Sequence, residues 1–205
     1  MESRWPTYPP YGPWDARLAG QEVCPSLQPV TVLHENEWFV VRNRGGYFTA
    51  EPREPQLVVL PVVERDHIVL VRVIRPVLDD ATFELPAGGF HPAQETPFQG
   101  AARELAEETG IVIEDLDRFK PLPSLAVSPN RIPRLVHLFQ VDLSWAEFDQ
   151  RRPHDHEICS VHCLPLPEVA RMILKGEIYV TMPVALIGRY WIARAMVGAE
   201  QDGRA

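Results

Sequence analysis

Residues 89–111, GFHPAQETPFQGAARELAEETGI, are the stretch around which the rest of the chain is organised. A helix brings residues three and four apart onto one face, so Glu104, Glu107 and Glu108 should converge. Like charges at this spacing destabilise an isolated helix by roughly 0.2–0.5 kcal/mol per pair, and only Arg103 compensates locally. The three carboxylates therefore predict a bound divalent cation. Mg²⁺ suits them, because it takes one or two carboxylates with waters and substrate phosphates.

The opposite face of this predicted helix is apolar. Phe98, Ala101, Ala102 and Leu105 follow the i, i+3, i+4, i+7 spacing of a stripe that packs on a core. Gly110 suits the left-handed position that ends a helix. The stretch thus predicts a loop followed by a helix with one dry face and one charged face.

Composition narrows the class of protein. The chain has 205 residues, 45% of them hydrophobic, with a formal net charge of −8 and no basic stripe, which speaks against nucleic-acid binding. No apolar run reaches the roughly 18 residues of a membrane span, and residues 1–14 lack the apolar core of a secretory signal. Cys24, Cys159 and Cys163 are too few for a disulfide framework, so we expect a cytoplasmic protein. An acidic protein that acts on phosphates needs a metal and a few placed arginines.

The spacing of the fixed residues identifies a family resemblance. Gly89, Glu95, Arg103-Glu104-Leu105, Glu107-Glu108 and Gly110-Ile111 match every fixed position of the Nudix box, so the chain resembles the Nudix hydrolase superfamily. This resemblance implies an α/β fold, a Nudix-type α/β/α sandwich of mixed sheet with a catalytic loop-helix. It also implies hydrolysis of a diphosphate linkage that depends on Mg²⁺ or Mn²⁺.

The family pattern assigns roles to the charged residues of the box. Glu104 and Glu108 would be direct metal ligands, and Glu107 would be a ligand or the base that activates water. Arg103 would orient these carboxylates, and Glu95 would tie the loop to the helix. How many metal ions bind is left open by the pattern.

Outside the box the chain resembles the ADP-ribose pyrophosphatase branch of the superfamily. That branch has a strand ending in arginine followed by E-L-P-A-G, and here Arg75 precedes Glu84 to Gly88. The resemblance implies that Arg75 and Glu84 bind substrate and that the carbonyl of Gly88, or else of Ala87, faces the metal. It also makes Glu157, near a C-terminal strand, the candidate general base, with a base inside the box as the alternative.

The substrate is the least determined part of the prediction. The branch favours ADP-ribose, cleaved to AMP and ribose 5-phosphate. The branch commonly has a proline at a set distance after the box, and here Pro129 lies further along the chain than that. Arg131 and Arg134 follow Pro129, so another nucleotide sugar is the alternative substrate. Two further classes are a Nudix module that binds such a ligand without cleaving it and an interaction protein that uses an aromatic N-terminal arm.

The other elements are predicted from periodicity and turn residues. Strand patterns occupy residues 38–42, 47–50, 56–63, 67–74, 82–86, 119–127, 135–141 and 157–164. Helices are expected at about 167–174 and 181–197, whereas residues 144–156 read as too irregular for a core element.

The predicted organisation has three parts: an N-terminal arm and hairpin at 1–50, a Nudix domain at 51–198 and a flexible tail at 199–205. The arm is rich in proline and aromatic residues, including Trp5 and Trp14, and either packs on a subunit or is disordered. A lone hairpin is marginally stable, so we expect residues 1–50 to mediate a homodimer. The expected ligand is a small nucleoside diphosphate compound, with neither nucleic acid nor membrane as partner.

Overall fold

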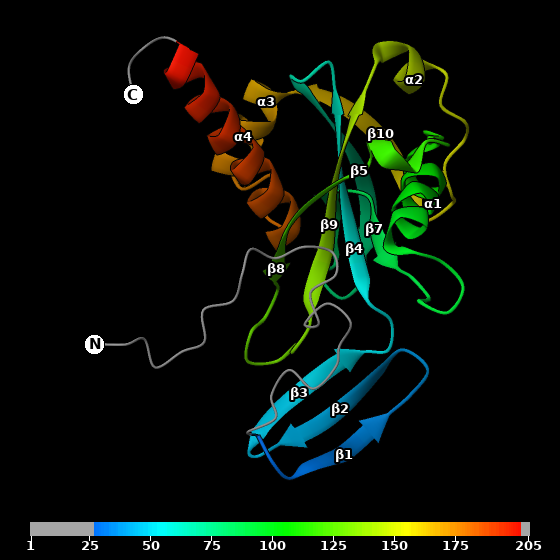
Figure 1. Cartoon of the computed structure of the whole chain (residues 1–205), viewed down its shortest axis with the longest axis vertical. Helices are drawn as coiled ribbons and strands as arrows, with labels where there is room; N and C mark the ends of the chain where they lie inside the picture. Colours follow the sequence, from blue (N-terminus) through cyan, green and yellow to red (C-terminus); the bar gives the residue numbers. More distant parts are fainter. Residues whose placement is uncertain (1–26, 202–205) are drawn as a thin grey trace. The chain divides into compact units, whose positions relative to one another are not determined.

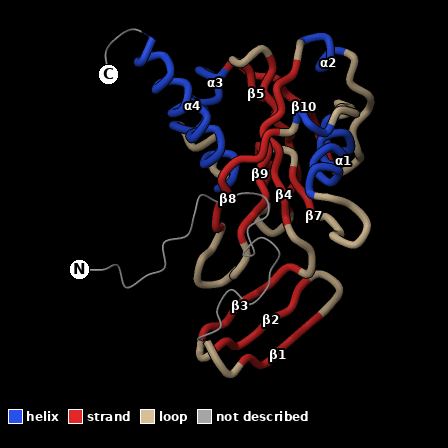
Figure 2. The backbone as a smooth tube through the Cα atoms, viewed as in Figure 1, coloured by secondary structure: helices blue, strands red, loops and turns tan. Residues whose placement is uncertain are grey.

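The computed structural model describes residues 27–201, along which strands and helices are mixed (Figures 1 and 2). The strands are β1 (Val30–Glu35), β2 (Phe39–Arg44), β3 (Tyr47–Pro52), β4 (Gln56–Val63), β5 (His67–Arg75), β6 (Asp80–Glu84), β7 (Ala87–Gly89), β8 (Lys120–Ala126), β9 (Leu135–Leu143) and β10 (Ile158–Pro165). The helices are α1 (Pro97–Thr109), α2 (Trp145–Asp149), α3 (Leu166–Leu174) and α4 (Thr181–Gln201), with a 3₁₀ turn at Leu116–Arg118.

The described residues divide into two compact units, each assembled from several segments. The first unit comprises residues 27–58, 87–101 and 119–140, and the second comprises residues 59–86, 102–118 and 141–201.

The first unit contains the antiparallel sheet β1–β2–β3, drawn as three neighbouring strands in Figure 2. Gly45 and Gly46 have φ angles of 57° and 97°, and the Gly46 N–H donates to Asn43 Oδ1 at 2.7 Å, which builds the turn between β2 and β3. The same unit contains the pair β8–β9 and the pairing of β7 with the start of β4, where Leu57 lies opposite Gly88.

The second unit is organised around β5, which pairs with β10 on one side and β6 on the other. The end of β4 joins β5 through a tight turn and pairs with it at Val62 and Ile68. β4 is rich in Val and Leu and β5 in Val and Ile, and both are buried except at the first residue of each and at Arg72, Ile74 and Arg75 of β5, as expected for the middle of a sheet. Helix α3 packs against β10 and β5, and α4 packs against β6.

The main sheet is mixed. Its strands are hydrogen-bonded in the order β10-β5-β4-β9-β8. The N–H of Glu64, just after β4, donates to the carbonyl of Leu143 at the end of β9, so these neighbouring strands run parallel, whereas β10, β5 and β4 alternate in direction. The α/β class with a mixed sheet and an N-terminal β-rich region is confirmed.

Three sequence expectations need correction. Helix α4 continues to Gln201 instead of ending near residue 197, so residues 199–201 are helical. Residues 144–156 are not wholly irregular, because α2 begins with a capping box in which Ser144 and Glu147 satisfy each other's backbone N–H. Strands β1 and β7 were not predicted. The proposed arm at 1–26 and residues 202–205 lie outside the described residues. No helix within residues 27–201 is both long and apolar enough to cross a membrane.

Candidate active site

The second unit brings Arg75 and Glu84 into direct contact across the hairpin of β5 and β6. Arg75 Nε and Nη2 donate to the two carboxylate oxygens of Glu84 at 2.7 and 2.9 Å, and Thr82 Oγ1 donates to Glu84 Oε1 at 2.6 Å. Burial alone would raise the pKa of Glu84, but these hydrogen bonds and the charge of Arg75 hold the pKa below its usual range. Glu84 is therefore an ionised carboxylate with a fixed orientation.

Glu157 approaches this pair from β10. The next residue, Ile158, lies opposite Val73 in the strand register and is buried with Val71 and Val73. Glu157 consequently sits beside the end of β5, where Arg75 lies two residues beyond Val73. The pKa of Arg75 is raised by the hydrogen bond to Glu84, against the effect of burial, and further by attraction to Glu84, Glu108 and Glu157. The structure thus gathers carboxylates from α1, β6 and the start of β10 around one guanidinium.

The charged face of α1 lies in the same unit. Glu104 is only 8% exposed, unusual for a carboxylate. Arg103 Nη1 contacts Glu104 Oε1 at 2.8 Å and Glu107 Oε2 at 2.9 Å, so one guanidinium joins two of the box carboxylates. The predicted convergence of these residues on one helix face is what the helix geometry produces.

A backbone junction fixes the end of α1 to the segment that carries Glu157. The N–H of Arg152 donates to the Gly110 carbonyl at 2.7 Å, and the N–H of Asp155 donates to the Glu107 carbonyl at 2.8 Å. Gly110 has a φ of 76°, and a Cβ on it would lie 1.8 Å from the Arg152 carbonyl oxygen. Glycine is thus required here by conformation and by space.

The glycines at the start of the box belong to the first unit. Gly88 and Gly89 form part of β7, where Gly89 pairs with Gln56. A Cβ on Gly89 would lie 2.7 Å from Glu54 Oε2, so the strand also runs close to a side chain. The role predicted for the Gly88 carbonyl stays a prediction, as does the choice between Gly88 and Ala87.

The side chains of the box fit Mg²⁺ or Mn²⁺ in their chemistry. Glu104, Glu107 and Glu108 offer only hard carboxylate oxygens, and no soft thiolate competes in that set. Among residues 27–201, no three Asp, Glu, His or Cys side chains are gathered closely enough to enclose a metal unaided. Mg²⁺ usually keeps waters and substrate phosphates as its remaining ligands, so one or two of these carboxylates meet its needs.

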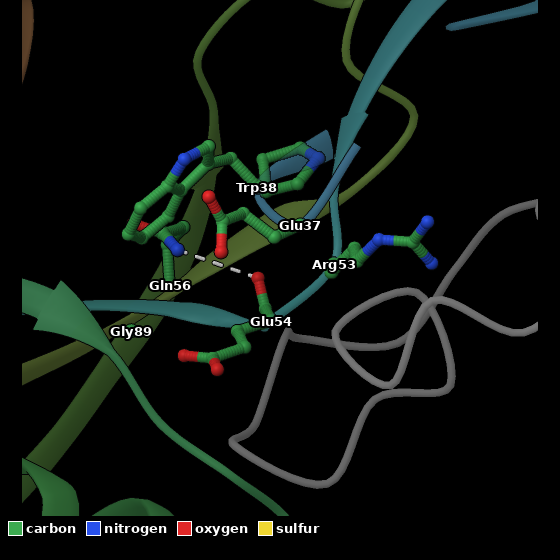
Figure 3. Close-up of a pocket in the computed structure, with 7 residues that line it drawn as sticks. Glu37, Trp38, Arg53, Glu54, Gln56 and Gly89 are labelled. Atoms are coloured by element: carbon green, nitrogen blue, oxygen red, sulfur yellow. Dashed lines mark hydrogen bonds between the residues drawn. The ribbon is translucent and has the colours of Figure 1, made fainter. Parts of the chain in front are cut away.

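The first unit contains a pocket that the sequence did not point to. It encloses about 290 Å³ and is lined by Glu37, Trp38, Pro52, Arg53, Glu54, Gln56 and Gly89. Trp38 is 73% exposed, and its ring and the Gln56 side chain lie on one side of the pocket in Figure 3. Arg53 points away, towards its bonds with the Glu35 carboxylate and the Asn36 carbonyl. Trp38 was predicted only as a strand residue, since the exposed face of a hairpin has no sequence signature.

Comparison with known proteins agrees with this picture. The NUDIX domain model matches residues 52–182. An ADP-ribose pyrophosphatase of Mycobacterium tuberculosis (strain ATCC 25618 / H37Rv) is 29% identical over 167 residues, covering 75% of this chain and 76% of the relative. A methanol dehydrogenase activator of Bacillus methanolicus is 34% identical over 81 residues, covering 40% of this chain and 42% of that protein. Because the family model spans more than half of the chain, this chain belongs to the NUDIX family of hydrolases.

Proposed function

We propose that this chain hydrolyses the diphosphate linkage of a nucleoside diphosphate joined to another moiety, with ADP-ribose, cleaved to AMP and ribose 5-phosphate, as the preferred substrate. The observation that carries the proposal is the gathering of Glu84, Glu108 and Glu157 around Arg75. The pyrophosphatase relative, alignable over most of both chains, supports the choice of ADP-ribose.

The proposed metal site consists of Glu104 and Glu108, with Glu107 and the Gly88 carbonyl as further candidate ligands. Bound Mg²⁺ or Mn²⁺ supplies a water of lowered pKa and neutralises charge on the phosphate oxygens. Arg103 holds Glu104 and Glu107 at fixed positions through its two ion pairs.

Arg75 is assigned to a substrate phosphate. Two of its nitrogens already donate to Glu84, which fixes the plane of the guanidinium and leaves the N–H groups of Nη1 for a phosphate oxygen. Glu84 is therefore assigned to orienting Arg75. Preorganisation of this kind lowers the entropy lost when the substrate binds.

Glu157 is the proposed general base. It is exposed to water, and among the described residues no arginine, lysine or histidine forms an ion pair with it. Glu107, the alternative, already accepts a hydrogen bond from Arg103 Nη1 on its Oε2 at 2.9 Å, so one of its two oxygens is occupied. Glu157 would accept a proton from the water whose oxygen bonds to one phosphorus. The bond between that phosphorus and the bridging oxygen would break, and the other phosphate would leave with the bridging oxygen, which gives AMP and ribose 5-phosphate.

The Trp38 pocket, taken within the first unit alone, is assigned to a nucleobase. An exposed indole beside Gln56 and Glu54 combines a stacking face with hydrogen-bonding groups, as recognition of a nucleobase requires. Trp38→Ala should weaken binding of adenosine to the full chain about tenfold, because stacking of a base on an aromatic ring contributes about 1–3 kcal/mol.

The sheet β1–β2–β3 is the proposed dimer surface. Val32, Leu33, Phe39, Tyr47 and Phe48 on β1, β2 and β3 are each at least 37% exposed, a concentration of apolar side chains that marks interaction surfaces. Sedimentation of the full chain at micromolar concentration tests for the homodimer, and a monomer would remove this part of the proposal. The cytoplasm is the proposed compartment, in keeping with the free thiols of Cys159 and Cys163.

The substrate is tested by comparing kcat/KM for ADP-ribose, GDP-mannose, UDP-glucose, NADH, diadenosine polyphosphate and dNTPs, each with Mg²⁺ and with EDTA. Specificity is the ratio of these values. ADP-ribose should lead, and EDTA should abolish turnover. A preference of about tenfold or more for dNTPs would contradict the assignment, and turnover in EDTA would contradict the metal.

A further inference from the structure

The first unit contains a carboxylate that is already saturated with hydrogen bonds. Glu51 on β3 has a side chain only 5% exposed. Its Oε1 accepts from Thr49 and from Arg44 Nε, both at 2.7 Å, and its Oε2 accepts from Arg44 Nη2 at 3.1 Å and from Arg42 Nη1. Arg42 and Arg44 are two residues apart on β2 and therefore extend from the same face of the sheet.

Arg134, just before β9, adds a third guanidinium to this cluster. The loop that precedes it is fixed beside β3, because the Ala50 N–H donates to the Arg131 carbonyl at 2.8 Å (Figure 1). Arg134 itself donates to the Arg53 carbonyl at 3.3 Å, a long hydrogen bond. No carboxylate of the described residues forms an ion pair with Arg134.

Among the described residues, the charges that act on Arg134 are one carboxylate, Glu51, and two arginines, Arg42 and Arg44. Burial lowers the pKa of Arg134 from its usual range, repulsion by Arg42 and Arg44 lowers it further, and Glu51 opposes both. A half-buried guanidinium that forms no ion pair loses part of its hydration free energy, and no protein carboxylate in contact with it compensates for that loss. Such an arrangement is stabilised when an anion completes it.

We infer that Arg42, Arg44 and Arg134 bind a phosphate group in the first unit. Guanidinium groups match the oxygen geometry of phosphate and can donate two parallel hydrogen bonds each. The side chain of Arg42 is 27% exposed and Arg134 is also partly exposed, so an ion can reach the cluster from solvent. The phosphate group could belong to a free phosphate ion or to a nucleotide. This inference does not depend on the proposed hydrolysis.

The test measures binding of inorganic phosphate and, separately, of AMP to the full chain by isothermal titration calorimetry. EDTA is present throughout, so that neither ligand binds through a metal, and NaCl holds the ionic strength constant. Arg134→Gln should weaken binding about tenfold, the loss of one charge-assisted hydrogen bond. Arg131→Gln is the matched control, because the Arg131 side chain is exposed and, among the described residues, donates to the carbonyls of Phe48 and Asn130 and to no carboxylate.

The two ligands distinguish the sources of the phosphate group. A loss confined to AMP would assign the site to a nucleotide phosphate, and a loss for inorganic phosphate would assign it to the free ion. The inference is overturned if the unchanged chain binds neither ligand, if Arg134→Gln binds both as tightly as the unchanged chain, or if Arg131→Gln loses as much as Arg134→Gln.

A second readout separates binding from a structural role. Without phosphate, Arg134→Gln should unfold at the same temperature as the unchanged chain or at a higher one, because it removes a repelled charge. Added phosphate should then raise the melting temperature of the unchanged chain more than that of the variant. A variant that melts lower in phosphate-free buffer would show that Arg134 supports the fold, which would also overturn the inference.

Discussion

Glu51 in the first unit and Glu84 in the second are held by the same local device. Each is the third residue of a Thr-x-Glu sequence on a strand, and each accepts a hydrogen bond from that threonine, at 2.7 Å from Thr49 and 2.6 Å from Thr82. Each also binds arginine through two oxygens. The surroundings differ in sign. Within the described residues, Arg42, Arg44 and Arg134 surround Glu51, whereas Glu84, Glu108 and Glu157 attract Arg75.

The difference shows how one motif can serve two electrostatic purposes. The arginines around Glu51 are what the inferred phosphate site requires, and the carboxylates around Arg75 are what the proposed metal site requires. In both places the threonine and the arginine fix the carboxylate before any ligand arrives. The orientation of the site is therefore a property of the fold.

Loss of a carboxylate near Arg75 should lower catalytic activity more than loss of a charge near Glu51. Glu108→Gln should lower kcat about 10²–10³-fold with the fold intact, because it removes a preorganised charge from the proposed metal site. Steady-state kinetics in Mg²⁺, with circular dichroism to check folding, measure this effect. Glu168→Gln on α3 is the control and should retain full activity. Normal turnover by Glu108→Gln would remove the metal role of Glu108.

Stability should show the opposite ranking. Glu51→Gln should cost about 3–5 kcal/mol of unfolding free energy, because it removes the carboxylate, itself only 5% exposed, that binds both Arg42 and Arg44. Glu84→Gln should cost no more than about 1 kcal/mol, since Arg75 is 46% exposed and water can take over. Urea denaturation measures both values, with Glu35→Gln on the exposed surface as the reference. Equal losses for Glu51 and Glu84 would break the comparison.

The position of the general base sharpens the account of the second unit. Glu157→Gln should lower kcat about 10²-fold and leave KM nearly unchanged, because a base acts on the chemical step. Glu107→Gln should have the smaller effect. If Glu157→Gln keeps the kcat of the unchanged chain while Glu107→Gln abolishes turnover, the base lies inside the box.

Acid should affect the first unit through His137. This ring is 4% exposed, its Nδ1 has no partner within the described structure, and it meets Phe90 edge-on at 5.1 Å. Burial lowers its pKa from 6.5 to about 4, so the unfolded chain takes up the proton first. The stability that this ring contributes is present above the unfolded pKa and is lost as the pH falls through the folded pKa. The loss could reach about 3 kcal/mol.

Comparing the unfolding free energies of the unchanged chain and His137→Leu between pH 7.5 and 4 isolates this contribution. The unchanged chain should lose more stability than the variant over this range. Parallel pH profiles for the two proteins would show that His137 does not titrate in this way.

The sequence predicts those elements of the fold that are set by residues close together in the chain, and it misses those that depend on contacts between distant segments. Strand β4 was predicted with its observed bounds, and the helix of the box ends at Thr109, because Val-rich runs and a terminal glycine are local signals. Strand β7 was not predicted, because Ala-Gly-Gly has low strand propensity and pairs with β4 through tertiary contact. Helix α2 was not predicted, because it is only five residues long and lies in a polar, acidic segment, although Ser144 and Glu147 form a capping box at its start.

The site follows the same division. The box carboxylates could be assigned because one helix face brings them together. Arg75 and Glu84 were each predicted to bind substrate. Their ion pair with each other was not predicted, because it depends on the register of β5 and β6. The arginines around Glu51 were not predicted as a cluster, because they come from β2 and from the segment before β9, which the sequence does not align. The contact of Thr82 with Glu84 is local to one strand and was not predicted either.

Gly110 has a consequence for synthesis of the chain. The carbonyls of Glu107 and Gly110 are capped by the N–H groups of Asp155 and Arg152, which leave the ribosome more than forty residues later. Until then water must solvate these carbonyls, and the last turn of the box helix lacks its native cap. The most recognisable segment of the chain therefore matures late, and a nascent chain stopped before residue 152 would carry the whole box without its finished end.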